Sequence, residues 1–208
     1  MTAQNQTQPL VSIDVVPVRF TDTIEVAVGR RIFEPFIGQL ALPGVLLLNG
    51  ESIVDAAYRA LEVKTGIEKG DVLELIQVGA FDNPDRDPRG PTISISFVAV
   101  IRQGELDDRA NIITDFDDLP FDHPNIIEAA LAAINVRLWG NQQVTRAVLG
   151  NTFSTTRAIA VTEAFSTGAV DKTNFNRMLK NYAPIERVEG VAVSGGKGRP
   201  PAQWAFTQ

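Results

Sequence analysis

Apolar and polar residues alternate along four segments of the chain, which is the pattern of strands that bury one face. They span residues 11–20, 24–28, 76–81 and 93–101, and the first two are rich in β-branched side chains. A fifth apolar segment, 40–48, is interrupted by Pro43 and Gly44. We therefore predict one group of strands before residue 50 and another after residue 75.

Two segments of the same region repeat their apolar residues at the spacing of a helix. The first begins near Ser52 and ends at Gly66, and the second follows Asp122, a good N-cap, to about residue 138. The single histidine, His123, lies in the first turn of the second helix, where we expect a capping or packing role. The order strand, strand, helix, strand, strand, helix predicts an α/β domain.

A second module follows, with two more helices and two strands. Residues 157–165 carry apolar side chains at helical spacing, Gly168 interrupts the pattern, and Asp171 can cap the next helix. Residues 185–193 and 204–206 look like strands around a glycine-rich segment. Helix, turn, helix and hairpin is the order of elements in a winged helix-turn-helix domain.

The charge of the chain changes at the same place. Residues 1–145 contain 11 basic and 21 acidic residues, whereas residues 146–208 contain 8 basic and 4 acidic residues. We therefore predict an acidic domain, 1–145, and a basic domain, 146–208. A basic module suggests a nucleic-acid partner, although small domains also carry surplus charge without one.

The composition excludes several classes of protein. Hydrophobic residues make up 44% of the 208 residues, which is enough for a core, and the absence of cysteine excludes disulfides and thiol chemistry. The sequence has no apolar run long enough for a membrane span, and its polar, uncharged start lacks the features of a signal peptide. We expect a cytoplasmic protein.

The outward face of the helix after Asp171 is suited to DNA, because its cations and amides can reach phosphates and base edges. A solvated surface helix would show the same periodicity. The hairpin that follows favours DNA, because a basic wing can lie along the phosphates. The candidate DNA-binding residues are Thr155, Thr156, Lys172, Thr173, Asn176, Arg177, Lys180, Lys197 and Arg199.

The segment 42–67 resembles the Nudix box, whose pattern is G-x5-E-x7-R-E-U-x-E-E-x-G-U, with U a bulky aliphatic residue. Five positions match at the right spacing, namely Glu51, Arg59, Leu61, Gly66 and Ile67. The opening glycine is replaced by Val45, and three carboxylates are replaced by Ala60, Val63 and Lys64. The resemblance implies the Nudix fold, an α+β sandwich.

Those three carboxylates hold the divalent metal ions with which active Nudix enzymes hydrolyse diphosphates. Here the same helix face offers a methyl group, an isopropyl group and the ammonium of Lys64, which places positive charge where the metal would lie. Glu62 points about 100° away from its neighbour on the helix and is a poor substitute. We expect no catalytic residue, no metal site and no cofactor.

A Nudix domain followed by a winged helix resembles the Nudix-related transcriptional regulators of NAD metabolism, the NrtR family. The resemblance spans nearly the whole chain and includes segments 34–36, 85–90, 121–123, 153–154 and 198–200. It implies a repressor of NAD biosynthesis or salvage genes, in which ADP-ribose or a related nucleotide weakens operator binding. It also implies a homodimer on a palindromic operator of double-stranded DNA.

The loop 82–91 is polar and rich in proline and glycine, so it is either a solvated connection or a site for a charged ligand. Its arginines favour a site. With the resemblance, Phe81 is a candidate to stack on adenine, and Glu51 can accept hydrogen bonds from ribose or cap the box helix. Guanidinium groups match phosphate oxygens, and the candidates for the diphosphate are Arg30, Arg31, Arg86 and Arg89.

Two alternatives remain open. An active Nudix hydrolase, such as an ADP-ribose pyrophosphatase with an appended basic domain, would require metal ligands other than those of the box. A Nudix-fold regulator of carbohydrate genes would keep DNA binding and replace the nucleotide by a sugar or a sugar phosphate.

Overall fold

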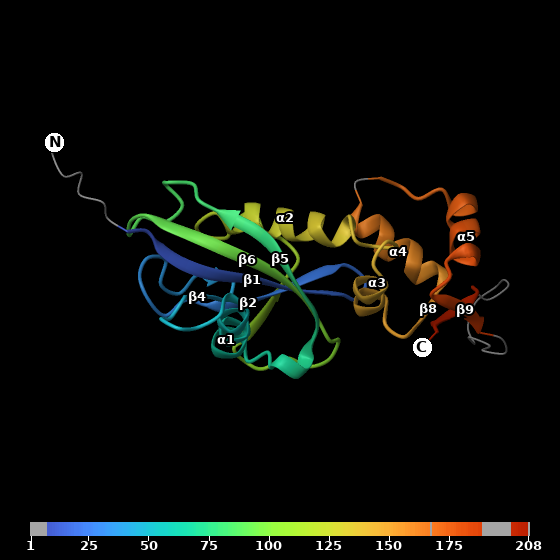
Figure 1. Cartoon of the computed structure of the whole chain (residues 1–208), viewed down its shortest axis with the longest axis horizontal. Helices are drawn as coiled ribbons and strands as arrows, with labels where there is room; N and C mark the ends of the chain where they lie inside the picture. The colour runs from blue at the N-terminus through green and yellow to red at the C-terminus, as the bar shows by residue number, and fades with distance from the viewer. Residues whose placement is uncertain (1–7, 167, 189–200, 208) are drawn as a thin grey trace.

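The computed structural model describes residues 8–166, 168–188 and 201–207, and Figure 1 shows two parts joined end to end. The first part is built on a large sheet whose central strands are β1 (Leu10–Phe20) and β6 (Thr92–Ile101). These two strands run parallel, and every other pairing in this sheet is antiparallel. The second part holds three helices and a small sheet.

Five more strands complete the large sheet. Its order is β3-β2-β1-β6-β5, while β4 pairs with β1 and β7 pairs with β2. The bounds of these strands are β2 (Ile24–Arg30), β3 (Leu40–Ala41), β4 (Gly44–Leu46), β5 (Val72–Phe81) and β7 (Ala110–Ile113).

One helix covers each face of this sheet: α1 (Ile53–Thr65) lies on one and α2 (His123–Asn135) on the other. Successive side chains of a strand point to opposite faces. Accordingly Val16 of β1 joins the core cluster that contains Ile126 of α2, whereas its neighbour Val15 joins the cluster that contains Leu61 of α1. The alternating side chains of β1 therefore contribute to two hydrophobic cores, one on each face of the sheet.

The ends of α1 are fixed by local chemistry. The hydroxyl of Ser52 accepts a hydrogen bond from the backbone N–H of Asp55 at 3.1 Å, and Gly66 ends the helix in the left-handed region at φ 68°. A short 3-10 turn, η1 (Lys69–Asp71), then leads into β5. A Cβ atom on Gly29 of β2 would lie 2.6 Å from the carbonyl oxygen of Lys64, so the last turn of α1 rests against the end of β2.

The second part is a winged helix-turn-helix domain. Its helices α4 and α5 are joined by a short connection, and its small sheet has the order β8-β10-β9. The indole of Trp139 lies between α4 and α5: its Nε1 donates to Thr162 at 3.0 Å, and its ring lies 5.4 Å from that of Phe175. The element bounds are α3 (Gln142–Leu149), β8 (Thr152–Ser154), α4 (Thr155–Phe165), α5 (Lys172–Asn181), β9 (Ile185–Val188) and β10 (Gln203–Phe206).

The predicted strands at 11–20, 24–28, 76–81 and 93–101 are confirmed as β1, β2, β5 and β6, and the four predicted helices are present. The helix after Asp122 ends at Asn135, earlier than predicted, and α3, β7 and β8 were not predicted. The expected boundary between residues 145 and 146 falls inside α3. Among the described residues, no helix is long and apolar enough to cross a membrane.

Candidate functional site

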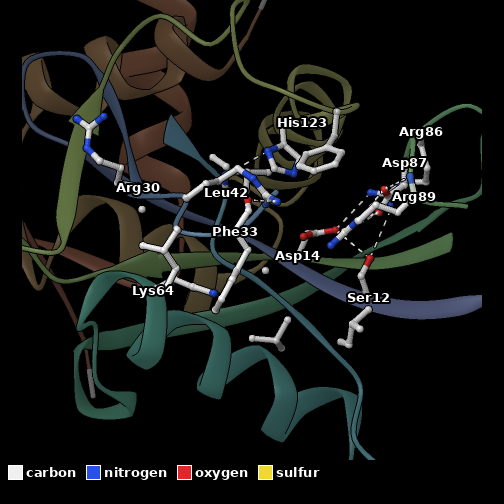
Figure 2. A pocket seen from close by; sticks show the side chains of 18 residues that line it. Ser12, Asp14, Arg30, Phe33, Leu42, Lys64, Arg86, Asp87, Arg89 and His123 are labelled. Carbon is white, nitrogen blue, oxygen red and sulfur yellow. Dashed lines mark hydrogen bonds and ion pairs between the residues drawn. The ribbon is translucent and has the colours of Figure 1, made fainter. Parts of the chain in front are cut away.

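A cavity of about 150 Å³ lies where β1, β2, the last turn of α1 and two loops meet. Its lining includes two carboxylates, Asp14 and Asp87, and two aromatic rings, those of Phe33 and Phe121. Figure 2 shows Arg86, Asp87 and Arg89 together on one side of this pocket, with Lys64 and Phe33 apart from them. The five cationic side chains of the lining are Arg30, Arg31, Lys64, Arg86 and Arg89.

Arg86 is buried and joins the loop 82–91 to the start of α2. Its Nε and one NH2 group donate to the two carboxylate oxygens of Asp122, each at 2.9 Å, and that NH2 group also donates to Asp14 at 3.3 Å. Burial alone would lower the pKa of Arg86, but the hydrogen bonds that it donates to Asp122 and the charge of Asp14 raise the pKa above its ordinary value.

This arrangement corrects two predictions. The guanidinium of Arg86 is already occupied by two carboxylates, so it builds the pocket wall and is not free to hold a diphosphate. Asp122 stands at the N-cap of α2, yet its side chain makes no capping hydrogen bond because it pairs with Arg86. A buried charge requires such partners, since leaving it unpaired costs several kcal/mol.

Asp14 forms the floor of the pocket and was not predicted. Its Oδ2 accepts hydrogen bonds from the hydroxyls of Ser94 at 2.6 Å and Ser12 at 3.2 Å. A Cβ atom on Gly44 would clash with Oδ1, so the backbone of β4 lies directly against this carboxylate. A lone carboxylate inside the apolar segment 11–20 is the sequence signal that could have identified it.

Arg31 and Arg89 lie on the accessible side of the pocket. Arg89 is exposed, and Asp87 orients it through hydrogen bonds of 3.0 Å from Nε and 2.6 Å from an NH2 group. The Nε of Arg31 donates to the carbonyl of Pro35 at 2.7 Å, and its guanidinium lies 4.7 Å from the ring centroid of Phe121. Burial and the charge of Arg89 lower the pKa of Arg31, which is the signature of two cations held close together.

The fourth predicted arginine, Arg30, is exposed at the edge of the pocket. Its NH1 group donates to the carbonyl of Gly38, in the loop between β2 and β3. It therefore lines the pocket, as Arg31 and Arg89 do, but from the rim.

Lys64 enters the pocket from the last turn of α1. Its ammonium lies 6.0 Å from the ring centroid of Phe33, and burial together with the charge of Arg31 lowers its pKa. Of the other two substituted box positions, Ala60 is buried in the core and Val63 is exposed. These residues do not fit a divalent metal, and among the described residues no group of three His, Cys, Asp or Glu side chains could hold one.

Glu51 and Phe81 do not line the pocket, which corrects both predictions. Arg59 donates to both carboxylate oxygens of Glu51 at 2.7 Å, and these hydrogen bonds lower the pKa of Glu51 to about 2. The cap of α1 is Ser52, so Glu51 does not serve that role either. Phe81 is half-buried against the core on the α2 side.

His123 is buried at the start of α2, where its Nδ1 accepts a hydrogen bond from the backbone N–H of Leu42 at 3.2 Å. Burial lowers its pKa to about 4, so the imidazole is neutral at physiological pH. The predicted packing role is confirmed.

The helix α5 carries the predicted DNA-binding face. Phe175 and Leu179 are buried against the rest of the domain, which turns the opposite face to solvent. The NH2 group of Arg177 donates to the side chain of Asn174 at 2.7 Å, a contact within the same helix. The predicted residues of α5 are all exposed: Lys172, Thr173, Asn176, Arg177 and Lys180.

Near α5, the structure removes one residue from the predicted DNA-binding set and adds another that was not predicted. Thr155 is buried, and its hydroxyl accepts from Trp204 Nε1 at 2.9 Å and donates to the carbonyl of Ala202, so its predicted DNA contact is replaced by a structural role. Thr156 is exposed in the first turn of α4. Arg187 of β9, which was not predicted, lines a cavity of about 620 Å³ beside the candidates Asn176 and Lys180. The predicted wing residues Lys197 and Arg199 lie outside the described residues.

Two characterised proteins are similar in sequence. An ADP-ribose pyrophosphatase from Methanocaldococcus jannaschii is 38% identical over 106 residues, which cover 48% of this chain and 61% of that protein, less than two thirds of its length. An ADPR responsive transcriptional repressor, NtrR, from Acinetobacter baylyi is 24% identical over 94% of this chain and 80% of that protein. No protein-family model matches the chain.

The similarity to a solved structure covers both parts of the chain. The crystal structure of Shewanella oneidensis NrtR complexed with a 27mer DNA matches with a TM-score of 0.77 and 19% identity, over 95% of this chain and 93% of that one. The chain has the NrtR fold. The NrtR fold combines a Nudix domain with a C-terminal winged helix-turn-helix domain, so the predicted fold class and the resemblance in fold are confirmed.

Proposed function

We propose that this protein is a transcriptional repressor whose Nudix domain binds ADP-ribose, or a related NAD-derived nucleotide, and does not hydrolyse it. One observation carries the proposal: a cation-lined pocket without a metal-binding face shares a chain with an exposed basic helix. It is supported by the similarity to an ADPR responsive repressor and to an NrtR solved with DNA. The expected targets are NAD biosynthesis or salvage genes.

The pocket suits a dinucleotide-like anion. Arg31 and Arg89 would hold the diphosphate, because guanidinium groups bind phosphate oxygens with directed hydrogen bonds and the like charges already in place favour an anion. Lys64 would take the electrostatic role that a metal has in active Nudix enzymes. The cavity of about 150 Å³ accommodates part of such a ligand, so the adenine would lie on the open rim against the exposed ring of Phe33.

Repression would use two copies of the chain. A homodimer would present two α5 helices, and a spacing of one helical turn between them would suit a palindromic operator of double-stranded DNA in the cytoplasm. Ligand weakens operator binding only if it binds the DNA-incompetent dimer more tightly. A tenfold change in operator affinity corresponds to about 1.4 kcal/mol of such preference.

The test is a fluorescence anisotropy titration with DNA from upstream of the protein's own gene and its neighbours. We expect sequence-specific binding that ADP-ribose weakens at least tenfold, with no release of AMP in the presence of Mg²⁺ or Mn²⁺. A scrambled DNA of equal length is the control for non-specific binding. Absence of sequence-specific binding both with and without ADP-ribose would refute the proposal.

A second candidate function is hydrolysis of ADP-ribose, favoured by the 38% identity with a pyrophosphatase. Incubation of the protein with ADP-ribose and Mg²⁺ or Mn²⁺, followed by detection of AMP, distinguishes it. The aligned region would then have to supply metal ligands from outside positions 60, 63 and 64. Turnover that Glu62→Gln abolishes would identify Glu62 as one of them.

A further inference from the structure

Arg157 crosses the junction between the two domains. It lies in the first turn of α4, and its guanidinium reaches the turn between β1 and β2. The NH2 groups of Arg157 donate to the carbonyl of Phe20 at 3.0 Å and to that of Thr21 at 3.3 Å. Other hydrogen bonds, each 3.4 Å, reach the carbonyls of Val148 and Leu149 at the end of α3.

Arg157 bonds α4 directly to the turn between β1 and β2, and Trp139 makes a separate hydrogen bond to Thr162 of the same helix. Among the residues that the structure describes, Arg157 makes the only hydrogen bonds between residues 146–207 and residues 8–135. Apolar contacts also cross the junction, and they place Val148 and Leu149 in the same core cluster as Phe20. Apolar contacts are non-directional, whereas a guanidinium fork fixes the positions of the oxygens that it binds.

The hairpin that Arg157 holds leads directly to the ligand pocket. Its strands pair near the turn through Val18 with Val26 and Phe20 with Ile24. Farther from the turn, the middle of β1 supplies Asp14 and β2 runs into Arg31, and both residues line the pocket. The six residue steps from Asp14 to Phe20 span about 20 Å, at roughly 3.3 Å per step along a strand. One pair of strands therefore has the pocket at one end and Arg157 at the other.

From Arg157 the contacts continue to the DNA-reading helix. Thr162, further along α4, accepts a hydrogen bond from the indole of Trp139, and that ring packs against Phe175 of α5. Trp139 therefore contacts both helices, and a displacement of α4 would reach α5 through it. The junction also leaves room for movement, because a cavity of about 630 Å³ lies beside Arg157 and is lined by both domains.

We propose that Arg157 is the positioning residue that transmits ligand binding from the pocket to α5. A ligand that pulls Arg31 and Lys64 together would shift the end of β2, and the hairpin would carry this shift to Arg157 and α4. The inference rests on the proposed function for the identity of the ligand. Coupling of this kind is established only by measuring it, and spatial continuity alone is insufficient.

The experiment compares Arg157→Gln with Arg146→Gln in the full-length protein. Arg146 lines the same cavity but bonds only to Asn151 within its own domain, so it is a matched control. In wild type we expect ADP-ribose to weaken operator binding at least tenfold. In Arg157→Gln this effect should fall below threefold, while the separate affinities for operator and for ADP-ribose stay within threefold of wild type. Arg146→Gln should keep the full effect.

A second measurement does not depend on DNA. Amide hydrogen exchange of α4 and α5 should respond to ADP-ribose in wild type and in Arg146→Gln, and should not respond in Arg157→Gln. If Arg157→Gln proves unfolded in a thermal melt, Arg157→Lys replaces it, because lysine keeps the charge but loses the planar guanidinium whose two NH2 groups bond separate carbonyls of the hairpin turn.

The outcomes separate the two proposals. A full ligand effect on operator binding in Arg157→Gln, or no exchange response in wild type, overturns the role of Arg157. A wild-type protein whose α4 and α5 respond to ADP-ribose, but which binds no specific DNA, refutes the proposed function and leaves the coupling standing.

Discussion

The pocket and the helix α5 both concentrate positive charge, but they hold it in opposite ways. In the pocket, Arg86 is fixed by two buried carboxylates and Arg89 is oriented by Asp87. On α5, Arg177 contacts only a neighbour on its own helix, and Lys180 is exposed. The pocket is therefore preorganised, whereas the helix presents exposed side chains to solvent.

This difference matches two kinds of anion. A small ligand must find its partners already in position, because each side chain immobilised on binding reduces affinity. The phosphates of DNA are regularly spaced and numerous, so binding depends on total charge and on counterion release more than on the geometry of each cation. Under the proposed function, arginine thus contributes to stability in the pocket and to salt-sensitive DNA binding on α5.

The largest expected effect is a loss of stability when the ion pairs of Arg86 in the pocket are removed. Arg86→Ala leaves Asp14 and Asp122 buried without their cation, so we expect the free energy of unfolding to fall by about 3–5 kcal/mol. Urea denaturation measures it. Arg177→Ala on α5 is the control, with a change of less than about 0.5 kcal/mol. A loss below about 1 kcal/mol for Arg86→Ala would show that the cluster is not a stabilising wall.

Acid should also destabilise the protein, through the buried imidazole of His123. The pKa of His123 is lowered to about 4 in the folded protein, so the unfolded state takes up the proton first as the pH falls below about 6.5. Stability is therefore full above pH 6.5 and decreases towards pH 4. We expect a loss of about 2 kcal/mol between pH 7 and pH 5 in urea denaturation.

The control for this pH effect is His123→Asn, whose side-chain oxygen can accept the hydrogen bond from Leu42 without titrating. Its stability should change by less than half as much over the same interval. An equal loss in the variant would assign the pH dependence to other groups.

Removing the cation that replaces the metal tests the ligand role of the pocket. We expect Lys64→Ala to weaken ADP-ribose binding about tenfold, or about 1.4 kcal/mol, because the ammonium lines a partly desolvated site. Isothermal titration calorimetry measures it. Lys69→Ala is the matched control, since Lys69 lies over the ring of Tyr58 and outside the pocket. Unchanged affinity in Lys64→Ala would place the diphosphate elsewhere.

The smallest effect per residue is expected on α5. Arg177→Ala and Lys180→Ala should each weaken operator binding several-fold and reduce the slope of log affinity against log salt by about one. Anisotropy titrations over a range of salt concentrations measure both quantities. Arg137→Ala, at the end of α2, is a basic control that should change neither. A slope that stays at the wild-type value would remove these residues from the DNA interface.

Much of the fold followed from local patterns. Alternation identified the central strands, and capping residues together with Gly66 delimited α1. The helix α3 was missed because its eight residues begin with two glutamines and offer too short a pattern. The strand β7 was missed for a similar reason, since it has four residues at the side of the sheet.

The residues that line the pocket were harder to predict from the sequence than the fold. The position of Lys64 in the pocket followed from helix spacing in the box, which is a local property. The pairing of Arg86 with Asp122 joins residues 36 positions apart, and no local pattern predicts such a contact. For the same reason the sequence pointed to Phe81, whereas the chain path brings Phe33 and Phe121 to the pocket.

Both tryptophans of the chain, Trp139 and Trp204, pack in or against the winged-helix domain, and neither lines the ligand pocket. The indole of Trp139 touches α4 and α5 at once. A ligand in the pocket therefore contacts neither indole directly. A change in tryptophan fluorescence on ligand binding would report a structural change in the winged-helix domain. The native tryptophans can therefore be used, without labelling, to detect coupling between the two domains.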